Sequence, residues 1–296
     1  MNLCFIVEER YRHELMPMSV VQQLRDWGHR VDVLEPHRTV TCLTALNAAR
    51  AYDAVVLKTV TDGPGLTLLE AAAATGIPTI NSVNSIRLVR NKAVAAAVAA
   101  ANGIPTPPTY FAARTEQLAN VGFDEYPIVV KPCNGSSGRS VHLVRSPRQL
   151  EAVRVDESQD RFLLAQGYAV NPGYDVKLYA LDGELFATSR PSPLHPEVVF
   201  EQHATPVTPE LRGIAMRVAT VFGLDIFGVD VVRTVSGWVV VDVNDFPSFG
   251  VVPDAVPRVA ATVLRLAARA ARSKHGTAGS PPLGAAVDVV VARSES

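Results

Sequence analysis

Short apolar runs alternate with helical stretches over the first 83 residues of the chain. Four runs have the length and β-branched content of buried strands, and two stretches between them have helical spacing: strands at 3–7, 30–36, 54–58 and 77–82, helices at 17–27 and 65–75. Strands and helices that alternate at this spacing predict βαβ units around a parallel sheet. No GxGxxG follows the first strand, so the pattern does not indicate a dinucleotide site there.

The pattern changes beyond residue 84. One helix is predicted from about 85 to 102, because Gly103 and the proline that follows it stop a helix. Short strands then dominate residues 107–168 and predict a small α+β unit, with helices near 115–121 and 147–154.

The rest of the pattern is mostly antiparallel. Residues 177–190 are predicted to form a hairpin that turns at Asp182-Gly183. A helix over 208–222 is delimited by its end residues, which are Thr208 as N-cap, Pro209 at the first position and Gly223 after the last turn. Two further strands and a closing helix follow, at 226–233, 237–244 and 256–272. The tail is rich in Gly, Ser and Pro, and whether 285–292 packs as a strand is left open.

Composition narrows the class of protein. The chain has 296 residues, of which 48% are hydrophobic and 19% charged, and its net charge is −1. Such a chain suits a soluble protein of about two domains, and its near-neutral charge argues against nucleic-acid and membrane partners. No stretch suits a membrane span or a signal peptide, and three scattered cysteines fit a reducing compartment. We therefore expect a cytoplasmic protein, whose oligomeric state is left open.

Two acidic residues are predicted to face each other on the last hairpin. If its strands pair about Ser236, Asp230 lies opposite Asp242, with Cβ atoms roughly 5 Å apart. Asn244 shares a strand face with Asp242, because side chains alternate along a strand. Like charges in opposed positions destabilise a sheet unless a cation joins them, and oxygen-only ligands suit Mg²⁺. The alternative is a solvated hairpin face whose register keeps the acids apart; the metal interpretation is favoured over it.

A loop of small residues interrupts VVKPCNGSSGRSVHLV at 129–144. Such a loop can bring several backbone N–H groups to phosphate oxygens, and Lys131 adds a positive charge beside it. The Walker pattern GxxxxGK[ST] is absent, and both flanks are predicted strands. Taken alone, the loop is better explained as a long hairpin turn. Together with the acidic hairpin, it favours a nucleotide site.

At this point the chain resembles the ATP-grasp superfamily and, within it, the RimK-like amino-acid ligases. The resemblance covers roughly residues 80–255 and rests on the order and spacing of five segments: NSVNSIRLVRNKAVAAAVAAANGIPTPPTYF, YPIVVKPCNGSSGRSV, LLAQGYA, GLDIFGVDVV and VVVDVNDFP. It implies an ATP-grasp fold of mixed α/β and α+β class. The expected units are an N-terminal parallel-sheet domain, a connecting helix, a lid domain, a C-terminal antiparallel-sheet domain with the metal site and a flexible tail, at 1–84, 85–106, 107–168, 169–273 and 274–296.

The resemblance also implies roles for individual residues. The nucleotide-binding positions are Lys92, Lys131, Gly135, Ser136, Ser137, Gly138, Gln166 and Tyr168. The metal positions are Asp230, Asp242 and Asn244, and the residues that reach substrate and transferring phosphate are Asp175, Lys177 and Arg190. Each has a simpler explanation in isolation: a solvated helix lysine, a lysine at a sheet edge, a strand cap, a surface ion pair or an exposed strand-end arginine.

In the family, ATP phosphorylates a carboxylate, and an amine then displaces the phosphate to form an amide. The resemblance therefore implies ATP, Mg²⁺ (two ions, replaceable by Mn²⁺) and small carboxylate and amine substrates such as amino acids or peptides. Asp242 stands where these ligases usually have glutamate, and their RSN-type substrate segment is missing.

Two other functions stay open. Some segments, RPS and DVNDFPSFGVVP among them, resemble inositol trisphosphate 5/6-kinases, which phosphorylate a hydroxyl and need a basic pocket. The 28 basic against 29 acidic residues favour the ligase over such a kinase. The third possibility is an ATP-binding module without turnover.

The N-terminal sheet is expected to frame a substrate. Ligands of open α/β sheets bind at the carboxyl ends of the strands, which here are Glu8–Arg12, Lys58 and Asn81–Ser82. His195 and His203 are predicted to be surface residues of a loop rather than catalytic bases.

Overall fold

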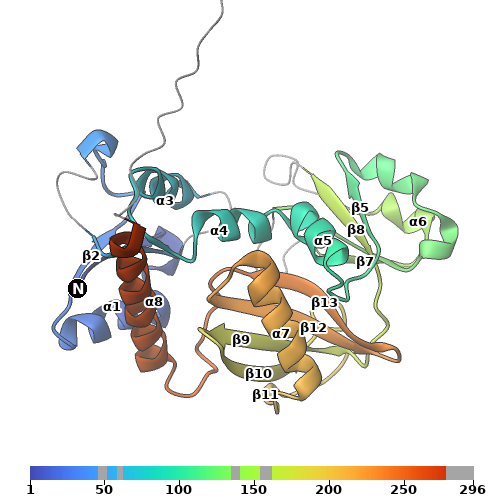
Figure 1. Cartoon of the computed structure of the whole chain (residues 1–296). Helices are drawn as coiled ribbons and strands as arrows, with labels where there is room; N and C mark the ends of the chain where they lie inside the picture. Colours follow the sequence, from blue (N-terminus) through green and yellow to red (C-terminus); the bar gives the residue numbers. More distant parts are fainter. Residues whose placement is uncertain (46–51, 59–62, 135–140, 154–161, 278–296) are drawn as a thin grey trace, which may run out of the picture.

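The computed structural model describes residues 1–45, 52–58, 63–134, 141–153 and 162–277 (Figure 1). This part of the chain contains three sheets, which we call the N-terminal, middle and C-terminal sheets. The first is parallel and the other two are antiparallel, so the expected mixed α/β and α+β class is confirmed. The division into separate domains stays a prediction. In the described residues no helix combines the length and the apolar character needed to cross a membrane.

The N-terminal sheet has the strand order β2-β1-β3-β4. Its elements are β1 (Asn2–Val7), η1 (Glu9–Tyr11), α1 (Leu15–Asp26), β2 (Arg30–Leu34), η2 (Leu43–Ala45), β3 (Ala54–Lys58), α3 (Pro64–Ala74) and β4 (Thr79–Ile80). Side chains alternate along β1: Leu3 and Phe5 pack with α1, whereas Cys4 and Ile6 pack with α3. The continuous apolar runs seen in the sequence therefore match strands buried on both faces.

Two helices replace the single helix predicted over 85–102. They are α4 (Val83–Arg90) and α5 (Lys92–Ala101). The break is at Asn91, whose backbone leaves the helical region and whose side-chain oxygen accepts a hydrogen bond from the Val94 N–H at 3.2 Å. Asparagine is a favoured N-cap, which explains why a second helix begins here. As a result Lys92 is the first residue of α5.

The middle sheet has the strand order β5-β8-β6-β7. Its elements are β5 (Thr109–Ala112), η3 (Thr115–Asn120), η4 (Phe123–Glu125), β6 (Ile128–Pro132), β7 (His142–Val144), α6 (Pro147–Leu150) and β8 (Leu163–Gly167). The helix predicted near 115–121 is a 3₁₀ helix, and the one predicted near 147–154 is a single turn. Neither segment therefore forms the regular α-helix that was predicted. Most buried residues of the local apolar cluster belong to the strands of the sheet.

The C-terminal sheet has the strand order β11-β10-β9-β12-β13. Its elements are β9 (Tyr174–Leu181), β10 (Glu184–Pro191), β11 (His203–Ala204), α7 (Pro209–Phe222), β12 (Ile226–Thr234), β13 (Gly237–Asn244) and α8 (Ala255–Thr277). The predicted ends of α7 are confirmed: the Thr208 hydroxyl accepts from the Leu211 N–H at 3.3 Å, and Gly223 adopts a φ of +64°. The buried stripe of α7 packs on one face of this sheet.

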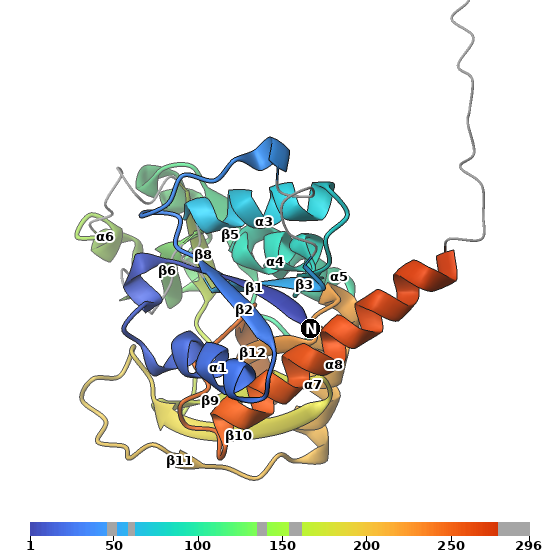
Figure 2. The same cartoon turned by 90° about the vertical axis from the view of Figure 1, so that its left-hand side faces the viewer.

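Helix α8 joins the C-terminal part of the chain to the N-terminal sheet. It packs beside α1 (Figure 2), and Val259 and Val263 share one apolar cluster with Leu3 and Phe5. The helix runs to Thr277, so its end lies beyond the expected residue 272 and includes the first four positions of the expected tail. Residues 285–292 lie outside the described part of the chain.

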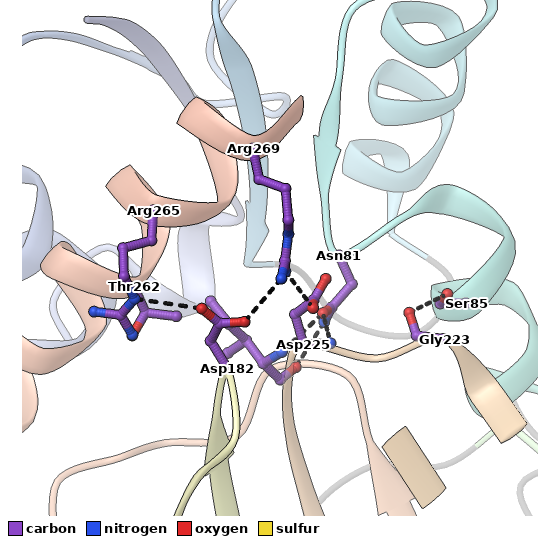
Figure 3. A network of polar contacts seen from close by, with 9 residues as sticks. Asn81, Ser85, Asp182, Gly223, Asp225, Thr262, Arg265 and Arg269 are labelled. Carbon is purple, nitrogen blue, oxygen red and sulfur yellow. Dashed lines mark hydrogen bonds and ion pairs between the residues drawn. The ribbon is translucent and has the colours of Figure 1, made fainter. Parts of the chain in front are cut away.

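A polar network also fixes the N-terminal sheet against the C-terminal sheet (Figure 3). Asn81, after β4, accepts from the N–H groups of Asp225 and Ile226 at 3.0 and 2.9 Å and donates to the carbonyls of Ile226 and Asp245, both at 2.6 Å. Nearby, Arg269 of α8 pairs with Asp182 and Asp225 at 3.2 and 2.6 Å. The two sheets are therefore held in a defined relative position beside the cavity described next.

Candidate functional site

A cavity of about 660 Å³ lies among the three sheets. All ten of the sequence-predicted site residues that the structure describes line it: Lys92, Lys131, Gln166, Tyr168, Asp175, Lys177, Arg190, Asp230, Asp242 and Asn244. The other four predicted positions, Gly135, Ser136, Ser137 and Gly138, lie outside the described residues. Residues far apart in the sequence thus meet at one site, which no single segment could have indicated.

The opposed carboxylates of the last hairpin are register partners. Asp230 of β12 pairs with Asp242 of β13, as the alternation predicts. The turn itself differs from the expectation: Thr234 pairs with Gly237, so the loop is centred half a residue before Ser236. A β-bulge between Asp230 and Val231 absorbs the difference and leaves Val241 as the extra residue on β13.

Asp230 is held by two cations. Lys177 Nζ lies 2.9 Å from Asp230 Oδ1, and Arg190 Nη2 lies 3.1 Å from Oδ2. Burial alone would raise the pKa of Asp230, but Lys177 and Arg190 outweigh it and hold the pKa below its usual value. The carboxylate is therefore ionised at neutral pH, as a metal ligand must be.

Asp175 completes a row of charges across β10, β9 and β12. It is the register partner of Arg190, as Lys177 is of Asp230. Arg190 Nε lies 2.5 Å from Asp175 Oδ1, while burial raises the pKa of Asp175 against the opposing effect of this arginine. Burial would lower the pKa of Arg190, yet Asp230 and Asp175 raise it, so the guanidinium stays charged.

The two predicted phosphate-binding lysines meet on β13. Lys92, at the start of α5, forms an ion pair with Asp242. Lys131 of β6 donates from Nζ to the carbonyl oxygen of Val241 at 3.0 Å. Burial lowers the pKa of Lys131 to about 8, partly opposed by the nearby Asp242. The bulge residue therefore provides the acceptor for a lysine that no carboxylate pairs with in the described residues.

The predicted nucleotide-binding positions Gln166 and Tyr168 lie at the end of β8. Gln166 is buried and donates from Nε2 to the Thr109 hydroxyl at 2.9 Å, so its amide is engaged within the middle sheet. Tyr168 and His195 form a hydrogen bond of 2.6 Å between the phenol oxygen and Nε2. The expectation that His195 is a surface residue is wrong, since its side chain is only 14% exposed, whereas His203 is exposed. The partial burial of His195 follows from its contact with Tyr168, which the sequence around His195 does not indicate.

Only some of the residues expected to frame a substrate at the N-terminal sheet lie at the cavity. Lys58 lines the cavity, together with Arg10 and Tyr11. Glu8 is buried and accepts from the Gly65 N–H at 3.0 Å instead. The side chains of Asn81 and Ser82 also serve structural bonds, in the network above and as the N-cap of α4, and neither residue lines the cavity.

Sequence reasoning missed one ion pair at the cavity. Arg90 ends α4 and forms a two-pronged pair with Asp245, with distances of 3.1 and 2.9 Å. The two residues are 155 positions apart. The only available signal was their position, two residues before Lys92 and directly after Asn244.

The residues at the hairpin fit a hard cation. Two opposed carboxylates and the Asn244 amide supply oxygen donors only, which suit Mg²⁺. Among the described residues no three or more His, Cys, Asp or Glu side chains gather as a metal cluster, so the set depends on the amide as its third donor. The donor chemistry fits, and the assignment stays a prediction.

The site geometry agrees with comparisons with known proteins. The model of the RimK-like ATP-grasp domain matches residues 89–254 of this chain. The chain belongs to this family. The ATP-grasp class expected for the fold and the expectation of an ATP-grasp ligase enzyme are thereby confirmed at the family level.

Individual relatives are more distant. A probable alpha-L-glutamate ligase of Mannheimia succiniciproducens is 27% identical over 248 residues, which are 74% of this chain and 82% of that protein. The RimK domain protein of Sphaerobacter thermophilus superposes with a TM-score of 0.68 at 22% identity, covering 89% of this chain and all of that one. A D-alanine–D-alanine ligase of Bacillus anthracis, complexed with ATP, gives a TM-score of 0.71 at 15% identity, covering 93% and 99%. At such identities the two structures support the fold alone.

Proposed function

We propose that this protein is an ATP- and Mg²⁺-dependent carboxylate–amine ligase that forms an amide or peptide bond through an acyl phosphate. One observation carries the proposal. Lys92 from α5, Lys131 from the middle sheet and the Asp230–Asp242 pair from the C-terminal sheet converge at one cavity. Phosphoryl transfer needs positioning and charge neutralisation more than covalent chemistry from the protein, and this arrangement provides both.

The proposed reaction has two steps. A carboxylate oxygen of the first substrate forms a bond to the terminal phosphorus of ATP while the bond to ADP breaks. The amine nitrogen of the second substrate then attacks the acyl carbon, inorganic phosphate leaves, and the amine proton passes to solvent. Because water would hydrolyse the acyl phosphate, exclusion of water from the site during the reaction would favour the amide product.

The cavity residues have distinct proposed roles. Lys92 and Lys131 neutralise phosphate charge, whereas Lys177 and Arg190 hold the reacting carboxylate and the transferring phosphate from the opposite sheet. Asp175 positions Arg190 through their short ion pair. Asp230, Asp242 and Asn244 would hold Mg²⁺, which on binding supplies charge neutralisation for the phosphates. Gln166 and Tyr168 would border the adenine at the end of β8.

The substrates are proposed to be an amino acid or peptide with a small acid or amine. Relatives named as probable alpha-L-glutamate ligases support this class. The kinase alternative needs free cations for several phosphates. In the described part of the cavity, however, four cations are each paired with a carboxylate: Lys92, Lys177, Arg190 and Arg90. This pairing reduces the net positive charge that a polyphosphate would meet, although Lys58 and Lys131 line the same cavity without an ion pair in the described residues. The reduced charge favours the ligase.

A single incubation distinguishes the three functions. The protein is mixed with Mg-ATP and pooled acids plus amines, or pooled polyols, and the terminal phosphate is followed by phosphorus NMR. Inorganic phosphate that appears only with acid plus amine supports the ligase, and added hydroxylamine should then give a hydroxamate. A new phosphoester would show a kinase. ATP unchanged with every pool would leave only the binding module.

A further inference from the structure

Lys58 is a buried lysine at the cavity that the proposed reaction does not use. It is the last residue of β3, at the carboxyl end of a central strand of the N-terminal sheet, opposite Val7 of β1. The residue is only 7% exposed, yet it lines the cavity. In open parallel sheets this end of the strands is where ligands bind. The contacts of its ammonium group therefore determine whether Lys58 can bind a ligand there.

The described residues satisfy only part of the hydrogen-bonding capacity of Lys58. An ammonium has three N–H donors, and Nζ donates one to the carbonyl oxygen of Phe246 at 2.6 Å. Nζ lies 4.7 Å from the centroid of the Tyr11 ring and 5.5 Å from that of the Phe246 ring. These two rings stabilise the positive charge through cation–π interactions but do not replace the missing hydrogen-bond acceptors. The described residues provide no ion pair for Lys58, and the nearby Asp245 is engaged by Arg90. A buried cation with unused donors faces the cavity.

The distribution of lysines points the same way. The chain has five lysines and 23 arginines. Four of the five line this one cavity: Lys58, Lys92, Lys131 and Lys177. Outside this cavity positive charge is carried by arginine, apart from Lys274, so the compact ammonium is concentrated at the site. Three of these lysines have proposed roles toward phosphate and the reacting carboxylate; Lys58, on the opposite sheet, does not.

We propose that Lys58 binds a carboxylate of the substrate that does not react, such as the free α-carboxylate of an amino acid. The inference rests on the proposed ligase function and narrows its substrate class to molecules that keep an ionised carboxylate apart from the group that reacts. A single ammonium between two aromatic rings matches one negative charge. The non-reacting carboxylate thus lies at the N-terminal sheet, while the reacting group points toward Lys177 and Arg190.

The test compares acids with their amides. The full chain is saturated with Mg²⁺ and the ATP analogue AMPPNP, and each of the common L-amino acids and its α-amide is titrated by calorimetry. The wild-type protein should bind at least one acid at least tenfold more tightly than its amide. Lys58→Met should remove this preference, because it weakens binding of the acid and leaves binding of the amide unchanged. Lys58→Arg should keep part of the preference. Arg87→Met is the matched control, since Arg87 is exposed, pairs with Glu70 and does not line the cavity.

Three results would overturn the inference: no acid preferred over its amide by the wild-type protein, a preference that survives in Lys58→Met, or an equal loss for acid and amide in that variant. The outcome is separable from that of the proposed function. If the protein prefers the acid to its amide through Lys58 but forms no ADP from ATP, the carboxylate subsite is supported and the ligase function is rejected. If the protein forms ADP and the Lys58→Met substitution does not change that rate, the ligase function is supported and the subsite is rejected.

Discussion

Asp230 and Asp242 face each other across β12 and β13 because a bulge restores the register that a tight turn would otherwise shift. The same bulge makes Val241 the residue whose carbonyl accepts the Lys131 ammonium at 3.0 Å. One local irregularity thus aligns the acidic pair and gives a lysine of another sheet its contact. Bulges beside active sites commonly re-aim groups in this way.

Asp242→Asn should reduce ATP turnover while leaving the fold intact. The side chain is a quarter exposed, and the substitution preserves its shape, so the free energy of unfolding should change by no more than about 1 kcal/mol. The loss of a metal donor and of the partner of Lys92 should lower turnover at least about 100-fold. Turnover and urea unfolding are measured together, and full activity in this variant would remove the proposed metal role.

Asp230→Asn provides a contrast on the same hairpin. Lys177 and Arg190 both pair with Asp230, whose side chain is only 12% exposed. Removing the charge leaves two buried cations undercompensated, which should cost about 3–5 kcal/mol of stability in addition to activity. Urea unfolding measures this cost. Equal stability of the two asparagine variants would contradict the described difference in burial and pairing.

Nucleotide affinity should fall at alkaline pH through Lys131. Its pKa in the free protein is lowered to about 8 by burial, so the ammonium is charged at pH 7 and increasingly neutral above pH 8. Since only the charged form attracts phosphate, the dissociation constant for Mg-ADP should be flat from pH 6.5 to 7.5 and rise above pH 8. Lys131→Arg should lack this rise, because a guanidinium stays charged. Calorimetry showing no rise in the wild-type protein up to pH 9.5 would argue against Lys131 as a phosphate ligand.

Lys58→Met should stabilise the protein at neutral pH. Burial lowers the pKa of Lys58 from 10.5 to about 8, so the unfolded state binds more protons between these values. The contribution of Lys58 to stability is therefore least favourable below pH 8 and improves as the pH rises toward 10.5. At pH 7 the variant should gain about 1–3 kcal/mol, and the gain should shrink with increasing pH. Urea unfolding of both proteins at pH 7 and pH 10 measures the difference, and a loss of stability at pH 7 would show that the charge is well compensated.

Asn81→Ala should weaken the join between the N-terminal and C-terminal sheets. Four backbone groups lose their partner, at Asp225, Ile226 and Asp245. Each buried polar group left without a partner costs about 1–3 kcal/mol, so a total of at least about 3 kcal/mol is expected. Ser85→Ala is the control, as it loses a 2.8 Å bond to the Gly223 carbonyl within the same region. Equal stabilities of the two variants would contradict the central position of Asn81.

Local signals predicted most of the fold. The Thr208 cap, the glycine at 223 and the alternation of apolar runs depend on neighbouring residues only, and each predicted the element that the structure contains. The break at Asn91 was missed because the apolar residues on both sides continue the helical spacing, while the cap is a single side-chain hydrogen bond. The end of α8 was placed too early because the composition of the tail begins to change before the helix ends.

The candidate site was only partly predictable. Alternation on one hairpin was sufficient to place Asp230 opposite Asp242, because that pairing is local. The Arg90–Asp245 pair and the Tyr168–His195 contact join segments that are distant in sequence, and no periodicity reports such contacts. Lys58 was marked only by its place at a strand end; its burial and its unused donors became visible in the structure.

Transfer of labelled oxygen tests the central claim most directly. An acid substrate labelled with ¹⁸O in its carboxylate is incubated with the protein, Mg-ATP and an amine, and the phosphate released is analysed by mass spectrometry. If the carboxylate oxygen attacks phosphorus, one ¹⁸O atom must appear in each inorganic phosphate formed with amide. Amide formation with unlabelled phosphate, or label retained wholly in the amide or in an acid phosphorylated on a hydroxyl group, would contradict the acyl-phosphate mechanism.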